Sequence, residues 1–433
     1  MKKIFLIITT GILTFFVSAE NYPYRSNVLW VTTPDHDNWL YKINEKASVT
    51  VSVYEFGILQ NNIEVSYSIG PELMPGEKSG NVILKDGKAE IPLGTMKAPG
   101  FLDCRLETTI GGRIYKHHIK VGFEPDKLKP YTKLPEDFVT FWDQAKQEAA
   151  ECPLMAERRF VPEFSSDKVN CYLVKLQVYK KDHYVYGYLT VPKKEGTFPL
   201  VFSPPGAGIK PMDPLKHMFY AEEGFIRFDM EIHGIRPDLD ADTYKEISRA
   251  FGKDNNSYLV NGLDNRDSYY MKKVYMACIG ALDYLTSLPE WDGKNLIAQG
   301  GSQGGALALI TAGLDKRITA CAANHPALSD MIAYKYGRAG GYPHLFTKFT
   351  GMDTPDKIRT LTYYDVVNFV RYINVPVFMT WGYNDNTCPP TTSYCVYNSI
   401  NSAKEALITP VNEHWVSTET RHVILKWIRD NLK

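Results

Sequence analysis

Residues 300–304 read Gly-Gly-Ser-Gln-Gly and match the pattern G-x-S-x-G, which occurs at one place in the chain. The apolar run 296–299 before it predicts a strand, and the segment 304–312 after it predicts a helix. A turn this tight holds its central residue in a strained backbone conformation, and glycine is needed where other backbone passes close by. The pattern therefore predicts Ser302 as a nucleophile above the end of a strand, with the backbone N–H of Gln303 directed at a developing oxyanion.

Strands and helices alternate on both sides of this turn. The expected strands lie at residues 172–179, 184–191, 200–203, 225–229, 296–299, 319–323, 377–381 and 405–409. The expected helices lie at residues 137–150, 269–288, 304–312 and 418–431. Short apolar strands that alternate with amphipathic helices are typical of a mostly parallel sheet that helices cover on both faces. The sequence therefore predicts an α/β catalytic domain over residues 130–433.

The first part of the chain has a different pattern. Valines alternate with polar residues along 47–53, and shorter alternating runs follow as far as residue 123. Turn signals such as Pro-Gly at 75–76 and Asp-Gly at 86–87 separate these runs. Even spacing of short alternating strands predicts a small antiparallel β-sandwich, immunoglobulin-like, over residues 20–125. No catalytic set of residues falls within it, so we expect a spacer in preference to a carbohydrate-binding unit.

A serine hydroxyl is a weak nucleophile until a base takes its proton, and after such a turn the expected chain order is serine, acid, histidine. Asp385 directly follows the predicted strand 377–381, and His414 follows the last predicted strand. Asp385 would orient the imidazole of His414 and stabilise its charged form. We therefore predict Ser302, Asp385 and His414 as the catalytic residues. The predicted fold class is an α/β-hydrolase fold with a mostly parallel sheet, preceded by the small all-β sandwich.

Other histidines and acids follow Ser302. His325 comes directly after the strand that follows the nucleophile turn, and we interpret it as a structural loop residue. His422 lies within the final predicted helix, as a surface or packing residue. Asp365 is a rival to Asp385, but it lies in a predicted helical segment with no strand immediately before it.

A second oxyanion donor is expected in the loop after an earlier strand. Residues 203–208 read Ser-Pro-Pro-Gly-Ala-Gly and follow the apolar run 200–202. Glycines let the backbone approach a substrate closely. We predict the N–H of Ala207 as this donor.

Composition excludes several other functions. The 433 residues suit two or three domains, and 49 Lys and Arg balance 49 Asp and Glu, so the basic footprint of a nucleic-acid binder is missing. The sequence has neither a C-x-x-C pair nor H-E-x-x-H, so it supports no metal and no cofactor. The seven cysteines leave at least one unpaired, and Cys388 and Cys395 are close enough in sequence to pair.

The chain begins with Lys2 and Lys3, an apolar run at 4–17 and small residues at 17–19. These three parts are typical of a secretory signal peptide, and the run is shorter than the roughly 20 apolar residues of a membrane span. We expect a signal peptide at 1–19, export to the periplasm or beyond the cell, and no membrane attachment after cleavage. An uncleaved anchor is the alternative.

Taken together, these residues resemble the acetyl xylan esterase and cephalosporin C deacetylase family, carbohydrate esterase family seven. The resemblance covers about residues 130–433. It rests on Pro-Glu-Asp-Phe at 135–138, Asp-Ser-Tyr-Tyr at 267–270, Ser-Leu-Pro-Glu at 287–290, the turn at 300–304, and residues 382–390 with Asp385, then His414. The resemblance implies removal of acetyl groups from xylan, xylo-oligosaccharides and similar acetylated carbohydrates, without a metal. It also allows a homo-oligomer.

The chain departs from the family pattern at three places. Ile-His-Gly-Ile at 232–235 stands where the family carries Arg-Gly-Gln, Pro-Gly-Ala at 205–207 replaces His-Gly-Tyr, and Trp415 replaces a Glu after the histidine. The chain is thus a divergent relative with an added N-terminal domain. A polar and aromatic insertion, 231–268, either overhangs the site or is a plain surface excursion. Two other functions stay open: a small serine peptidase of the prolyl-oligopeptidase type, and a non-catalytic carbohydrate-binding surface protein.

Overall fold

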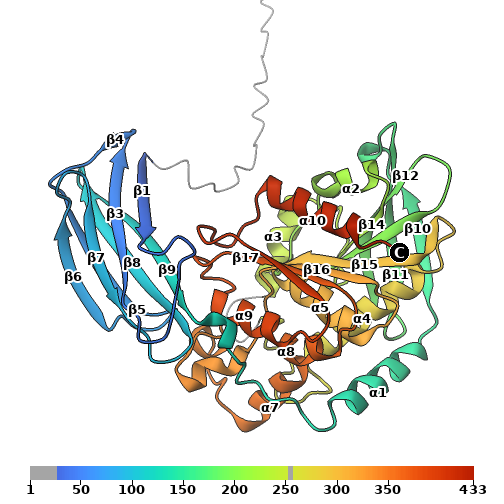
Figure 1. Cartoon of the computed structure of the whole chain (residues 1–433). Helices are drawn as coiled ribbons and strands as arrows, with labels where there is room; N and C mark the ends of the chain where they lie inside the picture. The colour runs from blue at the N-terminus through green and yellow to red at the C-terminus, as the bar shows by residue number, and fades with distance from the viewer. Residues whose placement is uncertain (1–26, 252–256) are drawn as a thin grey trace, which may run out of the picture.

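The computed structural model describes residues 27–251 and 257–433 and shows a β-rich N-terminal region beside a larger α/β region (Figure 1). The signal peptide expected at 1–19 lies outside the described residues. Within the described ranges, no helix is both long enough and apolar enough to cross a membrane.

Two sheets make up the N-terminal region. Their strands are β1 (Val28–Pro34), β2 (Leu40–Tyr41), β3 (Ala47–Glu55), β4 (Ile58–Leu59), β5 (Glu64–Pro71), β6 (Lys78–Ile83), β7 (Ala89–Gly94), β8 (Gly100–Ile110) and β9 (Arg113–Phe123). One sheet joins β1, β3, β4 and β7, and the other runs in the order β2-β9-β8-β5-β6. Val49, Val51, Leu106 and Ile119, drawn from both sheets, belong to one buried apolar cluster, so the two sheets share a core.

A nine-stranded sheet forms the centre of the α/β region. Its strands are β10 (Met155–Phe160), β11 (Val169–Gln177), β12 (Tyr184–Pro192), β13 (Phe198–Ser203), β14 (Ile226–Met230), β15 (Trp291–Gly301), β16 (Ala320–Asn324), β17 (Val377–Trp381) and β18 (Lys404–Ile408). They run in the order β10-β11-β12-β14-β13-β15-β16-β17-β18. The β10–β11, β11–β12 and β12–β14 pairs are antiparallel, and the pairs from β14 to β18 are parallel. The predicted fold class is therefore confirmed.

Helices cover both faces of this sheet. They are α1 (Phe138–Ala150), α2 (Phe219–Glu222), α3 (Ala241–Ala250), α4 (Tyr270–Leu285), α5 (Gln303–Leu314), α6 (Leu345–Lys348), α7 (Pro355–Tyr364), α8 (Val366–Phe369), α9 (Pro390–Ser399) and α10 (Thr418–Asp430). Residues of α1, α4 and α5 belong to the main buried cluster, whereas α2 and α10 pack with Val201, Ile297 and Phe378 in a second one. Since successive strand residues point to opposite faces, these two clusters mark the two sides of the sheet.

The local sequence explains the strand boundaries. All five residues of β16 and all five of β17 are buried, as expected for parallel strands under helices on both faces. Strand β15 begins at Trp291, five residues before the predicted run 296–299. Its first residues, which include Asp292 and Lys294, are partly or fully exposed. Polar residues at an exposed strand start carry no apolar signal, so the sequence pattern showed only the buried half of β15.

The two regions meet at one end of the five-stranded sheet, next to the loops that follow β17 and β18 (Figure 1). The ring of Phe101 in β8 lies 5.0 Å, centroid to centroid, from Tyr383 and 5.9 Å from Tyr394. Phe101 and Tyr383 also belong to the main buried cluster of the α/β region. An aromatic contact therefore joins the N-terminal sheet to the segment that carries Asp385.

Candidate active site

Ser302 occupies a strained turn between β15 and α5. Its φ of 59° and ψ of −125° lie in a region that residues other than glycine rarely adopt. A Cβ atom at Gly300 would lie 2.4 Å from the carbonyl oxygen of Gly304, and one at Gly304 would lie 2.4 Å from that of Pro204. Both distances are too short for any side chain, which is why the sequence has glycine on each side of the serine.

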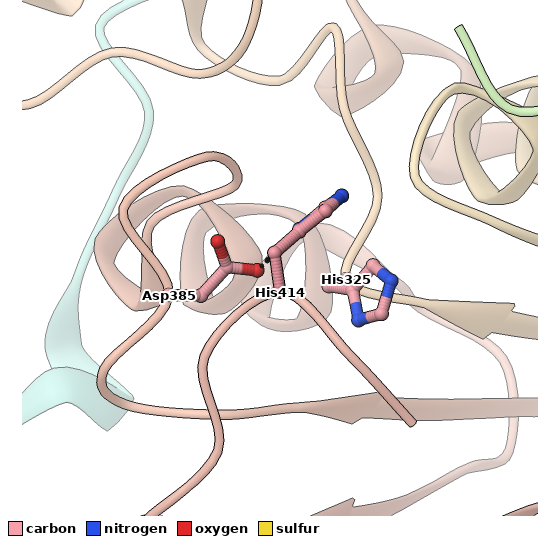
Figure 2. A group of neighbouring side chains, drawn as sticks. All are labelled: His325, Asp385 and His414. Atoms are coloured by element: carbon pink, nitrogen blue, oxygen red, sulfur yellow. Dashed lines mark hydrogen bonds and ion pairs between the residues drawn. The ribbon is translucent and has the colours of Figure 1, made fainter. Parts of the chain in front are cut away.

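Three predicted side chains form one hydrogen-bonded chain. The Nδ1 atom of His414 lies 2.7 Å from Oδ2 of Asp385, and its Nε2 lies 3.0 Å from Oγ of Ser302. Figure 2 shows the carboxylate of Asp385 beside the imidazole of His414. An ionised carboxylate only accepts hydrogen bonds, so Nδ1 carries the proton and Nε2 is left to accept from the serine hydroxyl. The structure thus brings together Ser302, Asp385 and His414, from three separate loops.

Asp385 is held as a buried anion. The backbone N–H groups of Thr387 and Cys388 donate to its Oδ1 at 2.7 and 2.9 Å. Burial alone would raise the pKa of this carboxyl, but the hydrogen bond and charge of His414, aided by the Cys388 N–H, outweigh burial and lower it. The carboxylate therefore stays ionised and can stabilise a positive charge on the imidazole of His414.

The two expected oxyanion donors lie on either side of the turn. Gln303 is the first residue of α5, where a backbone N–H has no acceptor within the helix. The loop with Pro204 and Gly206 packs on the turn: a Cβ at Gly206 would lie 3.9 Å from the Gly301 carbonyl oxygen. Ala207 follows directly in this loop. The structure therefore brings the two segments that were expected to supply oxyanion donors next to each other at the turn of Ser302.

A buried lysine of the N-terminal region holds the loop that carries Asp385. Nζ of Lys120, in β9, donates to the carbonyl oxygen of Asp385 at 2.7 Å and to Oε1 of Glu72 at 2.8 Å. The N–H of Lys120 donates to Oδ1 of Asn384 at 3.0 Å. The Lys120 side chain is fully buried, and burial raises the pKa of Glu72 despite the nearby ammonium. The sequence did not predict this contact, because nothing local in β9 marks Lys120 as the partner of a distant loop.

His325 lies closer to the site than the sequence suggested. It follows β16, and its ring centroid lies 4.3 Å from that of His414 (Figure 2). Burial lowers the pKa of His325 to about 4, so the ring is neutral at pH 7. The signal that could have revealed it is topological: β16 is parallel to β15, the strand that ends just before Ser302, so both carboxyl ends meet at one edge.

Two other candidates have structural roles. Asp365 caps α8 and accepts hydrogen bonds from the N–H groups of Asp330, Met331 and Val367. Burial raises the pKa of Asp365 to about 7, and its bonds are all to groups other than the predicted histidine. His422 lies exposed on α10, as predicted.

The insertion 231–268, of which 252–256 lie outside the described residues, does contact the site. The hydroxyl of Tyr258 donates to Oε1 of Gln303 at 2.7 Å and accepts from the N–H of Gly208 at 3.4 Å. The carboxylate of Glu231 binds the N–H groups of Gly234 and Ile235 at 2.9 and 3.0 Å. Tyr258 thus braces the two segments beside Ser302, and Glu231 holds the backbone of the insertion that follows it.

Neither cysteine pairing nor metal binding is needed to explain the site. All seven cysteines are free thiols, including Cys388 and Cys395, which the sequence offered as a pair. Donor atoms of His325, Asp385 and His414 lie within 4.8 Å of one another, close enough in principle for a metal ion. Since Asp385 and His414 already use these atoms for each other and for Ser302, we assign no metal to them.

A serine lies on a strained strand-to-helix turn above a mostly parallel sheet, and it is hydrogen-bonded to a histidine that in turn bonds to a buried carboxylate. This arrangement defines the protein as a hydrolase of the α/β-hydrolase class. The family model for acetyl xylan esterase (AXE1) matches residues 124–431. The acetyl esterase Axe7A of Xylanibacter ruminicola is 56% identical over 416 residues, which cover 96% of this chain and 93% of that protein. The chain therefore belongs to the acetyl xylan esterase family and is a carboxylesterase.

Solved structures agree with this assignment. An acetyl xylan esterase from Paenibacillus sp. R4 is 27% identical, with a TM-score of 0.63, and the match covers 71% of this chain and 99% of that one. Acetyl xylan esterase 1 from a Thermoanaerobacterium species is 22% identical, with a TM-score of 0.62 over 72% of this chain and 98% of the other, and supports the fold. The family membership favours a carboxylesterase over the serine peptidase and the non-catalytic binding protein that the sequence left open.

Proposed function

We propose that the protein removes acetyl groups from xylan, xylo-oligosaccharides or related carbohydrates, with Ser302 as nucleophile, His414 as base and Asp385 as the acid that orients it. The observation that carries this proposal is the continuous hydrogen-bonded chain from Asp385 through His414 to Ser302. The substrate class is supported by the family and by Axe7A, which is named an acetyl esterase.

In the proposed reaction, Nε2 of His414 takes the hydroxyl proton as Oγ of Ser302 attacks the acetyl carbonyl carbon. The N–H groups of Gln303 and Ala207 bind the oxyanion that develops, and one such donor is worth roughly a hundredfold or more in rate. His414 then returns its proton to the sugar hydroxyl as that group leaves. Water attacks the acetyl-enzyme by the same route and releases acetate.

The fixed charge of Asp385 explains why this reaction can run near neutral pH. The imidazole of His414 becomes positive in each proton transfer, and a carboxylate 2.7 Å from Nδ1 stabilises that charge. The carboxyl of Asp385 remains ionised because its pKa is lowered. We also propose that the enzyme acts outside the cytoplasm, in the periplasm or beyond the cell, as the pattern at 1–19 suggests.

The test is acetate release from acetylated xylo-oligosaccharides by the wild type and by the Ser302→Ala variant. Release by the wild type alone would support both the nucleophile and the substrate class. If the wild type hydrolyses nitrophenyl acetate but releases no acetate from the oligosaccharides, the carbohydrate substrate is wrong. If Ser302→Ala retains the wild-type rate, the nucleophile is wrong.

A further inference from the structure

A hollow of about 760 Å³ lies against the N-terminal five-stranded sheet, next to the loops of the candidate active site. Its floor is formed by β5, β8 and β9, and its wall by Asn386 and Glu413 of the α/β region. Asn386 directly follows Asp385, and Glu413 directly precedes His414. The hollow therefore begins where the hydrogen-bonded chain to Ser302 ends.

The strand pattern shows why this face of the sheet is open. In β8, Leu102, Cys104 and Leu106 point into the shared core of the two sheets, so Arg105 and Glu107 point to the other face. The first five residues of β8 and the last five of β9 are buried, because the α/β region covers that end of the sheet. The hollow lies where this cover stops, from Asp103 at the covered end of β8 to Glu107 farther along the strand.

The chemistry of the hollow suits a neutral, hydroxyl-rich ligand. Arg105 pairs with Asp103 at 2.9 Å, and Lys116 pairs with Glu107 at 3.1 Å. Each cation has an acid beside it, and the third acid, Glu413, lies beside His118. The surface therefore offers donors and acceptors together and no excess positive charge to attract a polyanion. A sugar hydroxyl donates one hydrogen bond and accepts others, so it can bind to both kinds of group.

The hollow also has an apolar side. Leu73 and Met74, both partly exposed, line it beside the polar floor. The faces of pyranose rings carry C–H groups that pack against apolar side chains, while their edges carry hydroxyls. A wall of Leu73 and Met74 beside paired charges therefore presents a suitable surface for each part of a sugar chain.

The two regions are linked across the hollow. His118 of β9 lies 3.3 Å from Oδ1 of Asp103, 3.4 Å from Nδ2 of Asn386 and 3.7 Å from Oε1 of Glu413. A ligand bound here would therefore contact the N-terminal sheet and the two catalytic loops at once. The volume of the hollow lies within the roughly 300–1,000 Å³ typical of ligand sites.

We propose that this hollow binds the sugar chain of the substrate, at sugar units several positions along the chain from the one whose acetyl group lies at Ser302. The N-terminal region would thus form part of the substrate-binding surface rather than a spacer. This inference rests on the proposed carbohydrate substrate. It predicts that the enzyme binds a xylose chain that carries no acetyl group.

The test is isothermal titration of unacetylated xylohexaose into the wild type and into two kinds of variant. Ser66 is exposed on β5 and lines the hollow, so the Ser66→Trp variant would fill it. The double variant Glu107→Ala, Lys116→Ala removes one exposed ion pair at little cost in stability. Thr50→Trp places the same bulk on an exposed site of β3 in the other sheet and serves as the matched control.

We expect the wild type and Thr50→Trp to bind xylohexaose alike, and Ser66→Trp to bind at least about tenfold more weakly, a difference of about 1.4 kcal/mol. The double variant should also weaken binding. In turnover, Ser66→Trp should lower kcat/KM for acetylated oligosaccharides more than for nitrophenyl acetate. Thermal unfolding of each variant would show that it is folded.

Binding that is absent in the wild type, or equal in the wild type and Ser66→Trp, would overturn the assignment of the hollow. Acetate release decides the proposed function separately. A wild type that releases acetate but binds no xylohexaose would overturn the hollow alone. A wild type that binds xylohexaose through the hollow but releases no acetate would overturn the proposed function alone.

Discussion

The two sheet systems of this chain are covered in different ways. In the α/β region, β16 and β17 are buried along their whole length, since helices cover both faces of the sheet. In the N-terminal region, β3 alternates between buried and more exposed residues, since one face packs on the shared core and the other is uncovered. A sheet covered on both faces offers ligands only its strand ends, whereas a half-covered sheet also offers a broad face.

This difference suggests a division of labour. The α/β region presents Ser302, Asp385 and His414 at the carboxyl ends of its strands. The N-terminal region offers an open polar face and a buried cation, Lys120, which bonds to the carbonyl of Asp385. Chemistry is therefore expected to depend on the first region, and placement of the acid and of the substrate on the second.

The largest effect should come from Ser302→Ala. If Ser302 is the nucleophile, kcat of the variant should fall about a millionfold while the protein stays folded. The measurement is hydrolysis of nitrophenyl acetate, with circular dichroism to confirm the fold. Ser52→Ala, in β3 of the N-terminal region, is the matched control and should keep full activity. A substantial rate in Ser302→Ala would break the comparison.

Asp385→Asn should cost about 10⁴-fold in kcat, since an amide holds the wrong tautomer of the histidine and carries no charge. The Thr387 and Cys388 N–H groups can still donate to its Oδ1, so the loop should keep its shape. Steady-state kinetics on the same ester would measure the loss. Asp365→Asn tests the rival acid; if that variant lost more activity than Asp385→Asn, the assignment of the acid would be wrong.

The buried pair tests the contribution of the N-terminal region. Removing Lys120 alone would strand the buried Glu72, so the suitable variant is Lys120→Met with Glu72→Met, because apolar replacement of a buried pair is often tolerated. Loss of the bond to the Asp385 carbonyl should lower kcat about tenfold, equivalent to about 1.4 kcal/mol. KM for nitrophenyl acetate should stay the same.

A structural defect without a role in placement would give a different result for this pair. In that case the melting temperature would fall while kcat of the folded fraction stayed at the wild-type value. The single variant Lys120→Arg keeps a cation beside Glu72. A higher kcat in this variant than in the double variant would support the role in placement. An unchanged kcat in the double variant would show that the Asp385 loop is positioned by the α/β region alone.

The smallest effect concerns the stability of the folded protein at low pH. Burial lowers the pKa of His233, His325 and His344 in the α/β region to about 4, and that of His117 in the N-terminal region to about 4. In the unfolded chain a histidine has a pKa of about 6.5, so between these values the unfolded state binds more protons. The stability that these four histidines contribute is therefore fully present above pH 6.5 and falls as the pH drops toward 4.

Three of these four groups lie in the α/β region, so the histidine contribution lost at pH 5 is larger there, although the raised pKa of Asp365 offsets part of it. We expect that region to lose amide protection first at pH 5. Hydrogen exchange at pH 7 and pH 5, corrected for the intrinsic exchange rates, would measure it. Replacing His325 with Gln should reduce the acid sensitivity of the α/β region. Earlier loss of protection in β3 and β9 would contradict this prediction.

The fold and the core of the site were largely predictable from the sequence. The glycines around Ser302 identify it as the predicted nucleophile. The expected chain order then leads to Asp385 and His414, each of which follows an apolar strand. Lys120 and Tyr258 were not predictable, because their partners are Asp385 and Gln303, 265 and 45 residues further along the chain. Local periodicity reports which face of an element is buried, but it does not report which distant loop covers that face.

The contact of Phe101 with Tyr383 and Tyr394 has a practical consequence for anyone who wishes to shorten the enzyme. The family match begins at residue 124, which invites a truncation there. Such a cut would bare the aromatic rings of Tyr383 and Tyr394 and remove the ammonium from the Asp385 carbonyl. A minimal enzyme would need polar replacements at those rings to remain soluble, and a new partner for the loop to remain active.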